Sequence, residues 1–496
     1  MKNHPLFIGI DIGTQGTKTV LCDIKGKVFD EEFCPSNLIR PDSQTVYEQP
    51  QEILDSVIKT VRAITERQTK ASESIAAICL DAQMAGIMAV DKDFNAVTPL
   101  DSWLDSRCRN YTAIIKEQAG DAAIMSSGGQ IIHSHASKIL WWKNEHPDTY
   151  KKICKFIQPN GYVAGKLCGI KAQDAFMDYT FLHFNVFSDN ANLRFNKALL
   201  SEFGVDEDKM PGIVSPEYTV GEVTPEFARA MGLPGGVKVV AGCGDTAASS
   251  LGAGITKAGL AYDVAGTASV FACCTDKFAP DTENRTLLFG RSVCEGLFLP
   301  LSYISGGGLC LKWFSDITGK SLKELDGDAE KTDTNETVFI PHFSGRTLPL
   351  DDGVSGAFLG LNAAADKGIM FRSILESIAF EYKSYLDILM RSGAIGKLDC
   401  VYGVGGGAKS AVFSQIKADV LGARYMSLAN ADSAPAAMAL LGAKATGYLG
   451  GDFGEIFGAA NNGGKIYDCN QEANARYIPK AERYLKLLDG YSNYII

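Results

Sequence analysis

The sequence lacks an excess of basic residues: 48 lysines and arginines stand against 58 aspartates and glutamates, a formal net charge of -10 at pH 7. A surface that binds nucleic acid usually presents a basic stripe, so this balance disfavours a nucleic-acid groove. The N-terminus, MKNHPLFIGIDIG, carries only a short apolar stretch, too short for a signal peptide or a membrane span. We therefore expect no nucleic-acid or membrane partner, and a cytoplasmic location.

Two familiar motifs are also missing. The 13 cysteines include no C-x-x-C pair, and only Cys273 and Cys274 are neighbours, which is typical of buried thiols in a reducing compartment. The nearest candidate for a Walker A loop, Gly319-Lys320-Ser321, has Phe314 where the opening glycine should stand. A P-loop phosphate site is therefore excluded.

The length and composition indicate a globular protein with more than one core. A chain of 496 residues exceeds what one hydrophobic core usually serves, and 46% hydrophobic with 21% charged residues is ordinary for a folded protein. Short apolar runs predict strands at 6–11, 19–22, 27–29, 76–80, 237–241 and 259–263. Helical spacing predicts helices over 50–69 and 371–389. The pattern is that of a mixed α/β protein with two domains.

Two short segments in the two halves resemble each other. Asp11-Ile12-Gly13-Thr14-Gln15-Gly16-Thr17 and Asp263-Val264-Ala265-Gly266-Thr267-Ala268-Ser269 each follow one strand and precede another. Two ordinary hairpin turns would explain the likeness equally well. Read functionally, Gly and Thr at a turn expose backbone N–H groups and a hydroxyl, and they let phosphate oxygens approach closely. Two such turns would hold a triphosphate.

Two aspartates are candidates for the chemistry. Asp11 and Asp245 could hold Mg²⁺, mostly through water, because this hard ion prefers carboxylate and phosphate oxygens. Asp245 lies in AGCGDTAA, where glycines meet an alanine-rich helix, so a helix N-cap is its ordinary role. Its functional role would be that of a general base, which accepts a proton from a substrate hydroxyl as the oxygen attacks the γ-phosphate.

A third glycine-rich segment, YGVGGGAKS at 402–410, follows an apolar strand and opens a helix. Strand, glycine turn and helix N-terminus together form a nucleotide cradle. A dehydrogenase would offer a similar element, but Ala408 stands in the last place of G-x-G-x-x-G and no second βαβ half follows.

Together these motifs resemble the FGGY carbohydrate kinase family. DIGTQGTK, AGCGDTAA, DVAGTAS and YGVGGGAKS occur in the family's order, and the resemblance covers nearly the whole chain. Further segments resemble the xylulose kinase branch: YEQ at 47–49, AQM at 82–84, SWLDSR at 102–107 and KILW at 138–141. GRTLP at 345–349 also fits the family.

The resemblance implies two actin-like (ribonuclease H-like) α/β domains with a cleft between them. It assigns sugar binding to residues 1–240 and ATP binding to residues 241–496, with the last helix packing back on the first domain. Asp245 matches the catalytic base, and Asp11 the metal-associated carboxylate, with Asp245 as its metal-binding partner. The residues implied to bind ATP and its phosphates are Gly13, Thr14, Gln15, Thr17, Lys18, Gly266, Thr267, Gly405, Gly406, Gly407 and Lys409. Those implied on the sugar side are Gln83, Met84, Ala85, Trp103, Asp105, Arg107, Asp245 and Thr246.

Some of these residues also have plainer explanations. Met84 and Trp103 could be core packing, and Asp105 with Arg107 a surface ion pair. The xylulose kinase branch usually reads Gln-Met-His-Gly where this chain has Ala85 in place of the histidine, and often asparagine where it has Thr246. A site that lacks a polar partner discriminates between related sugars, so these departures bear on the substrate and not on phosphoryl transfer.

The expected function is transfer of the γ-phosphate of ATP, with Mg²⁺, to a hydroxyl of a small ketose, D-xylulose first. Ribulose, another ketose, a polyol or a sugar acid are the alternatives within the family. Outside it stand an actin-like ATPase that is not a sugar kinase, and a dehydrogenase built on the 402–410 turn. The expected partners are the sugar and ATP, and a homodimer is compatible with the sequence.

Overall fold

The structure is a computed structural model that describes residues 4–333, 336–343, 345–351, 353–428, 434–458 and 464–495. Its contacts divide the chain into two compact units. Unit 1 contains residues 1–254, 289–295 and 432–458; unit 2 contains residues 255–288, 296–431 and 459–496. The chain first passes from one unit to the other after Gly254. The assignment of sugar binding to 1–240 and of ATP binding to 241–496 stays a prediction.

Unit 1 is built on a mixed sheet whose first strand lies near its centre. In order, its strands are β13 (Thr219–Glu222), β14 (Lys238–Gly244), β5 (Ile75–Ala82), β1 (Leu6–Gly13), β2 (Gly16–Asp23) and β3 (Val28–Pro35). β1, β2 and β3 are antiparallel neighbours, whereas β5 pairs parallel with β1 and β14 parallel with β5. β3 extends well beyond the predicted 27–29, because alternate residues of this edge strand are exposed and hide its apolar pattern.

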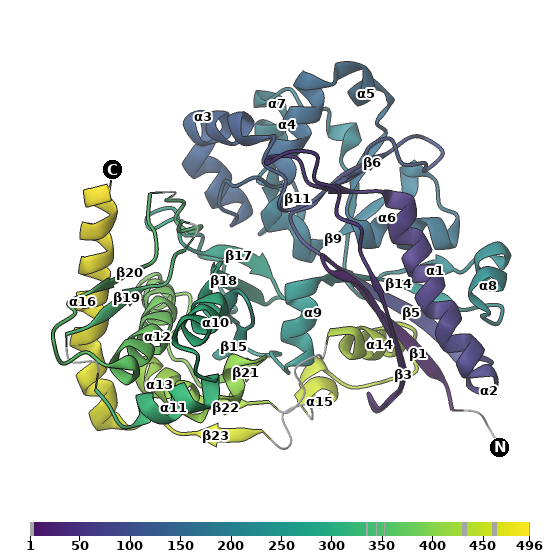
Figure 1. Cartoon of the computed structure of the whole chain (residues 1–496). Helices are drawn as coiled ribbons and strands as arrows, with labels where there is room; N and C mark the ends of the chain where they lie inside the picture. Colours follow the sequence, from purple (N-terminus) through teal and green to yellow (C-terminus); the bar gives the residue numbers. More distant parts are fainter. Residues whose placement is uncertain are drawn as a thin grey trace. The chain divides into compact units, whose positions relative to one another are not determined.

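Helices cover both faces of this sheet (Figure 1). Along β2, Thr17 and Thr19 point to α1 (Pro50–Arg67), where their hydroxyls bond those of Ser56 and Thr60 at 2.6 and 2.7 Å. The alternate residues Val20 and Cys22 pack on the opposite face with alanines of α14 (Ala434–Ala445). This alternation follows the two-residue period of a strand.

The contact between β1 and α14 requires a glycine. A Cβ at Gly9 would stand 1.7 Å from the carbonyl oxygen of Pro435, so no larger residue lets the helix approach. The return of the chain to unit 1 is thus made by α14, which Figure 1 shows in yellow-green beside β1. The last helix, α16 (Gln471–Ile495), belongs instead to unit 2, where it packs against α12 (Lys367–Arg391) and α13 (Ala411–Leu421).

Unit 1 carries a second helical layer with its own core. Trp142, Phe156 and Phe187 are among its buried residues. The helices around it are α3 (Arg109–Ser127), α4 (His135–Glu145), α5 (Pro147–Lys152) and α7 (Lys197–Glu202). This layer supports the segment at residues 101–107 discussed below.

Unit 2 repeats the strand order of unit 1. Six strands of its seven-stranded sheet follow in the order β18 (Phe298–Ile304), β16 (Ser269–Cys273), β15 (Leu260–Ala265), β21 (Cys400–Val404), β22 (Arg424–Ser427) and β23 (Lys465–Tyr467). β15 pairs antiparallel with β16 and parallel with β21, as β1 does with β2 and β5. The expected fold class, two actin-like (ribonuclease H-like) α/β domains, is confirmed. The two similar segments of the sequence are the first hairpins of the two sheets.

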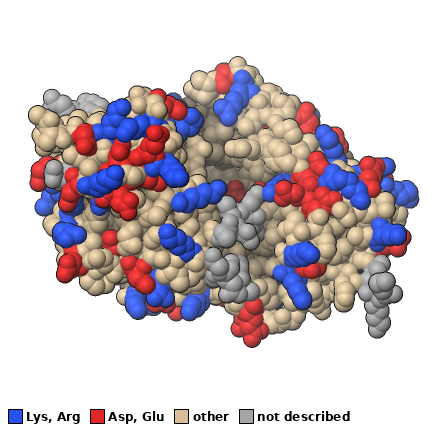
Figure 2. Space-filling model, turned by 60° about the horizontal axis from the view of Figure 1, so that its bottom comes forward, with Lys and Arg blue, Asp and Glu red and all other residues tan. Residues whose placement is uncertain are grey.

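The surface agrees with the charge balance of the chain. On the face drawn in Figure 2, acidic and basic side chains of the described residues are interspersed, and no continuous basic stripe appears. Within the described part of the chain, no helix is both long and apolar enough to cross a membrane.

Candidate active site

Three aspartates of unit 1 lie at the carboxyl ends of adjacent parallel strands. In the sheet register Asp11 of β1 pairs with Asp81 of β5, and Asp81 pairs with Cys243 of β14. Asp245 follows directly, as the first residue of α9 (Asp245–Gly252). Ligands of α/β sheets bind outside the carboxyl ends of the strands, so this edge is the candidate catalytic site.

The environment of Asp245 differs from that of an ordinary surface aspartate. Burial, and after it the negative charge of Asp11, raise the pKa of Asp245 to about 7, although the hydrogen bonds from Thr246 lower it. Its Oδ1 accepts hydrogen bonds from the backbone N–H of Thr246 at 2.6 Å and from the Thr246 hydroxyl at 3.2 Å. The N-cap of α9 is Gly244, so the N-cap interpretation of Asp245 is wrong. A carboxyl that titrates near neutrality suits a general base.

The acidic edge also fits a magnesium ion that is bound with a phosphate. The charge of Asp11 raises the pKa of Asp245, which shows that the two carboxylates repel each other, and a divalent cation would relieve that repulsion. Among the described residues, no group of three or more His, Cys, Asp or Glu side chains could hold a metal by itself. Mg²⁺ takes one or two carboxylates and completes its shell with water and phosphate oxygens, so this donor set is adequate.

The predicted phosphate turn of unit 1 is a tight hairpin. Gly13 pairs with Gly16 across the ladder, which leaves Thr14 and Gln15 at the tip. Gly16 has φ 157°, and a Cβ there would stand 2.3 Å from the carbonyl oxygen of Cys34. Beside the turn lies a cavity of about 480 Å³, lined by Asp11, Gly13, Thr14, Gln15, Gly16, Lys18, Glu31 and Phe33.

Two residues predicted to bind phosphates have partners within the fold. Lys18 lies 3.3 Å from a carboxylate oxygen of Glu31 and lines the same cavity. Thr17 is buried, and its hydroxyl is the one that bonds Ser56 of α1. The Thr17 side chain therefore anchors the phosphate turn to α1.

The two glycine segments of unit 2 lie against each other. A Cβ at Gly405 would stand 2.9 Å from the carbonyl oxygen of Ala265, and a Cβ at Gly407 would stand 2.5 Å from that residue's Cβ. Gly266 and Thr267 at the hairpin tip, Gly406 and Lys409 are exposed. Ser410 then caps α13, since its Oγ accepts from the N–H of Phe413 at 3.1 Å. The predicted strand, glycine turn and helix are all present.

The predicted sugar-side turn packs next to Asp245. Met84 covers Gly244, where a Cβ would stand 2.4 Å from the methionine Cε. Ala85 has φ 57°, the left-handed region that few residues other than glycine adopt. Its carbonyl accepts a hydrogen bond at 3.2 Å from Lys138, a lysine that is only 1% exposed. Sequence reasoning assigned no role to this lysine.

Asp105 and Arg107 form an ion pair, but a mostly buried one. The Arg107 Nε donates to Asp105 Oδ2 at 2.8 Å, and its Nη2 donates to Asp101 Oδ1 at 2.6 Å. The guanidinium also lies 4.2 Å from the ring centre of Trp141. Burial raises the pKa of Asp101 to about 6, against the opposing charge of Arg107. These contacts hold the 101–107 segment in place.

Gln83 is almost completely buried and donates from Nε2 to Glu48 Oε1 at 2.6 Å. Burial raises the pKa of Glu48 to about 7. Sequence reasoning missed Glu48 and Asp81 as site residues. The signal for Asp81 was present, because it ends a strand as Asp11 does. Glu48 lies in the YEQ segment at 47–49 that resembles the xylulose kinase branch, but only the fold brings it to Gln83.

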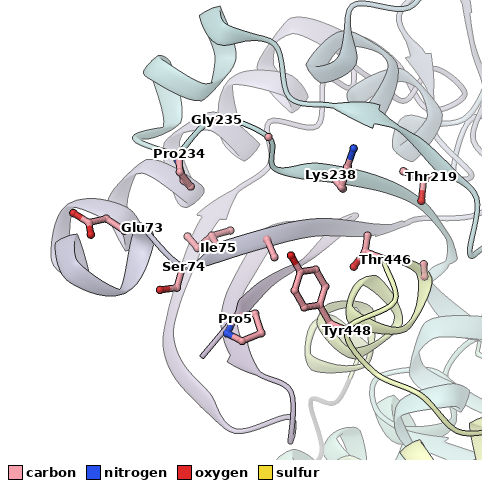
Figure 3. A pocket seen from close by; sticks show the side chains of 13 residues that line it. Pro5, Glu73, Ser74, Ile75, Thr219, Pro234, Gly235, Lys238, Thr446 and Tyr448 are labelled. Atoms are coloured by element: carbon pink, nitrogen blue, oxygen red, sulfur yellow. The ribbon is translucent and has the colours of Figure 1, made fainter. Parts of the chain in front are cut away.

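A larger cavity lies at the other end of the same strands (Figure 3). It measures about 750 Å³ and is lined by Ser74, Lys238, Thr446 and Tyr448, among others. Ile75 and Lys238 open β5 and β14, so this is the amino edge of the sheet. The Lys238 ammonium already lies 2.7 Å from Glu222. We therefore do not assign substrates to this cavity.

The comparisons with known proteins agree with this geometry. The chain is 28% identical to a gluconokinase of Bacillus licheniformis, over 89% of this chain and 88% of that protein. It is 24% identical to a xylulose kinase of Bacillus subtilis (strain 168), over 98% of this chain and 96% of that protein. The structure matches the ligand-bound xylulose kinase of Lactobacillus acidophilus with a TM-score of 0.90 at 22% identity, over 98% of each chain. That last likeness is one of fold.

The family models match both halves of the chain. Residues 6–252 match the N-terminal domain of the FGGY family of carbohydrate kinases, and residues 261–446 match its C-terminal domain. The interpretations as a non-kinase ATPase and as a dehydrogenase are thereby set aside. With its two ribonuclease H-like sheets and the acidic edge beside a glycine-threonine turn, this chain belongs to the FGGY family of carbohydrate kinases and is an ATP-dependent sugar kinase.

Proposed function

We propose that the protein transfers the γ-phosphate of ATP to a hydroxyl of a small ketose, with D-xylulose as the first candidate, in the cytoplasm. The observation that carries the proposal is Asp245, a partly buried carboxyl with a pKa of about 7 at the carboxyl edge of the sheet. Support for the substrate comes from the relatives named xylulose kinase. Support for the location comes from the 13 cysteines, which all lie in the described part of the chain and none of which is in a disulfide.

In this proposal the chain's own residues position and deprotonate the substrate. Asp245 accepts the proton of the attacking hydroxyl at a carboxylate oxygen, while the Thr246 hydroxyl and N–H hold its other oxygen. Thr14 and Thr267 offer hydroxyls and turn N–H groups to the phosphates, and residues 405–407 leave room for the adenosine. Asp11 and Asp245 would hold Mg²⁺, which neutralises charge on the phosphates when it is bound.

A sugar acid is the second candidate. The gluconokinase of Bacillus licheniformis is 28% identical, more than the 24% of the Bacillus subtilis xylulose kinase. Ala85 also removes the histidine that the xylulose branch usually has at the sugar side.

A sugar panel with Mg-ATP, read by coupled ADP release, decides between these substrates. It should contain D-xylulose, L- and D-ribulose, ketohexoses, glycerol and other polyols, and D-gluconate. The proposal expects rapid sugar-dependent ADP release with negligible release in the absence of sugar. If D-gluconate is the preferred acceptor, the ketose assignment is wrong; if no acceptor in the panel stimulates ADP release, the proposed function is wrong as a whole.

A further inference from the structure

A hydrogen bond joins the sugar-side segment of unit 1 to its phosphate turn. The indole Nε1 of Trp103 donates to the hydroxyl oxygen of Thr14 at 2.9 Å, although the two residues are 89 positions apart. The Thr14 carbonyl accepts a second bond, from the Ser36 hydroxyl at 2.6 Å. Thr14 is thus held from both its side chain and its backbone.

Trp103 reaches Thr14 from a firmly anchored base. The preceding residue, Ser102, is buried, and its N–H donates to the carbonyl of Val46 at 3.0 Å. Before it, the Asp101 carboxylate accepts bonds from Arg107 and from the indole of Trp142, both at 2.6 Å. The Trp103 side chain itself remains 45% exposed. Because the segment that carries Trp103 is buried and its charge is paired, the ring has little freedom to move. Its exposed part is still open to ligands.

The same base contacts the turn that carries Met84 and Ala85. A Cβ at Gly86 would stand 3.1 Å from the carbonyl oxygen of Asp101 and 3.8 Å from the backbone nitrogen of Trp103. The predicted sugar side and the predicted phosphate side of unit 1 are therefore mechanically connected through Trp103.

The direction of the hydrogen bond matters chemically. An indole N–H can only donate, so it occupies an acceptor site of the Thr14 oxygen and leaves the hydroxyl proton for another partner. That proton is then directed away from Trp103, and a hydroxyl that already accepts a bond is a better donor. An anionic phosphate oxygen is the partner that gains most from such a donor.

We propose that Trp103 is a positioning residue of the phosphate turn, which orients the Thr14 hydroxyl as a donor to the γ-phosphate of ATP and so links the sugar-side segment to nucleotide binding. This rests on the proposed function. It differs from the expectation that Trp103 serves the sugar alone.

The test is a double-mutant cycle on nucleotide binding, which needs no knowledge of the sugar. The variants are Trp103→Phe, which keeps an aromatic ring but has no N–H, Thr14→Val, which keeps the shape but has no hydroxyl, and both together. The affinity for magnesium with the non-hydrolysable β,γ-imido analogue of ATP is measured by calorimetry. Trp313→Phe, in unit 2, is the matched control, and thermal unfolding checks that each variant is folded.

We expect Trp103→Phe to raise the Kd of the nucleotide by about two- to tenfold, the size of one neutral hydrogen bond. In the Thr14→Val background the same change should add less than about twofold, whereas in a Thr14→Ser background, which keeps a hydroxyl, it should retain its full effect. Trp313→Phe should leave Kd unchanged.

Three results would overturn the proposal. The first is that the fold-changes in nucleotide Kd caused by Trp103→Phe and by Thr14→Val multiply in the double variant. The others are a Trp103→Phe variant with the wild-type Kd, and a Trp103→Phe defect confined to the KM of the sugar. A wild-type protein that binds the analogue but phosphorylates no acceptor contradicts the proposed function and leaves this cycle readable. A wild-type protein that does not bind the analogue contradicts both.

Discussion

Replacement of Asp245 by asparagine tests the centre of the proposed mechanism. Asparagine keeps the size of the side chain and an oxygen that can accept from Thr246, but it cannot take a proton from the substrate. Loss of general-base catalysis usually costs about two to four orders of magnitude in turnover, which is about 3–5 kcal/mol in activation free energy. Nucleotide binding should be retained.

The raised pKa of Asp245 adds two pH-dependent expectations. Because the base must be ionised, the wild-type kcat/KM should fall as the pH drops below about 7. Stability depends on pH in the opposite direction. Because the folded state binds this proton more tightly than the unfolded state, ionisation of Asp245 lowers the free energy of unfolding as the pH rises from about 4 to about 7. A shift of this size corresponds to at most about 4 kcal/mol, and the solvent contact that the carboxyl retains reduces this to about 1 kcal/mol.

The Asp245→Asn variant should therefore unfold about 1–2 °C higher than the wild type at pH 8, with the difference vanishing near pH 4. Turnover is measured by coupled ADP release across pH 5–9, and unfolding by calorimetry at the same pH values. Asp55→Asn, an exposed aspartate on α1, is the control and should change neither quantity. Turnover within about tenfold of the wild type, or an acid limb of the pH profile that persists in a residually active variant, would refute the role of Asp245.

Three further predictions concern the metal, the sugar and the fold. Asp11→Ala should raise the magnesium concentration for half-maximal rate by about 10- to 100-fold, the usual loss when support around a metal is removed; a defect seen only in the KM of the sugar would contradict this. Ala85→His should shift the ratio of kcat/KM toward D-xylulose by about two- to tenfold, because it restores one hydrogen-bonding group at a left-handed position that histidine tolerates. A ratio that is unchanged in the variant, or that shifts away from D-xylulose, would contradict this. Lys417→Met should lower the free energy of unfolding of unit 2 by about 3–5 kcal/mol, because it leaves the buried carboxylate of Asp263 without its ion-pair partner. Urea titrations measure this loss, and a further Asp263→Asn change should recover most of it.

The local patterns of the sequence predicted most of the fold. Apolar runs placed β1, β5, β14 and β15 to within a few residues, and helical spacing placed α1 and α12. These patterns work because the two-residue period of a strand and the 3.6-residue period of a helix are properties of neighbouring residues. The likeness between 11–17 and 263–269 likewise identified the first hairpin of each sheet.

The partners of charged residues could not be read from the same patterns. Asp11 and Asp263 occupy equivalent places in the two hairpins, yet Asp263 is completely buried, paired with Lys417 of α13 and bonded by the hydroxyls of Tyr382 and Tyr425. Asp11 instead lines the cavity of about 480 Å³ beside the phosphate turn. The likeness in sequence therefore did not carry over to a likeness in chemistry.

The sequence by itself thus determined the family, the α/β class, the two glycine-threonine hairpins and the aspartates that follow strands, since each of these is written in residues adjacent along the chain. Only the tertiary structure decided which of those residues act together. It buried Asp105 and Arg107 in an ion pair, brought Glu48 to Gln83, returned α14 to β1 and set the indole of Trp103 on Thr14. Burial, which raises the pKa of Asp245, and contacts between residues far apart in sequence arise only when the chain packs, so no local pattern records them.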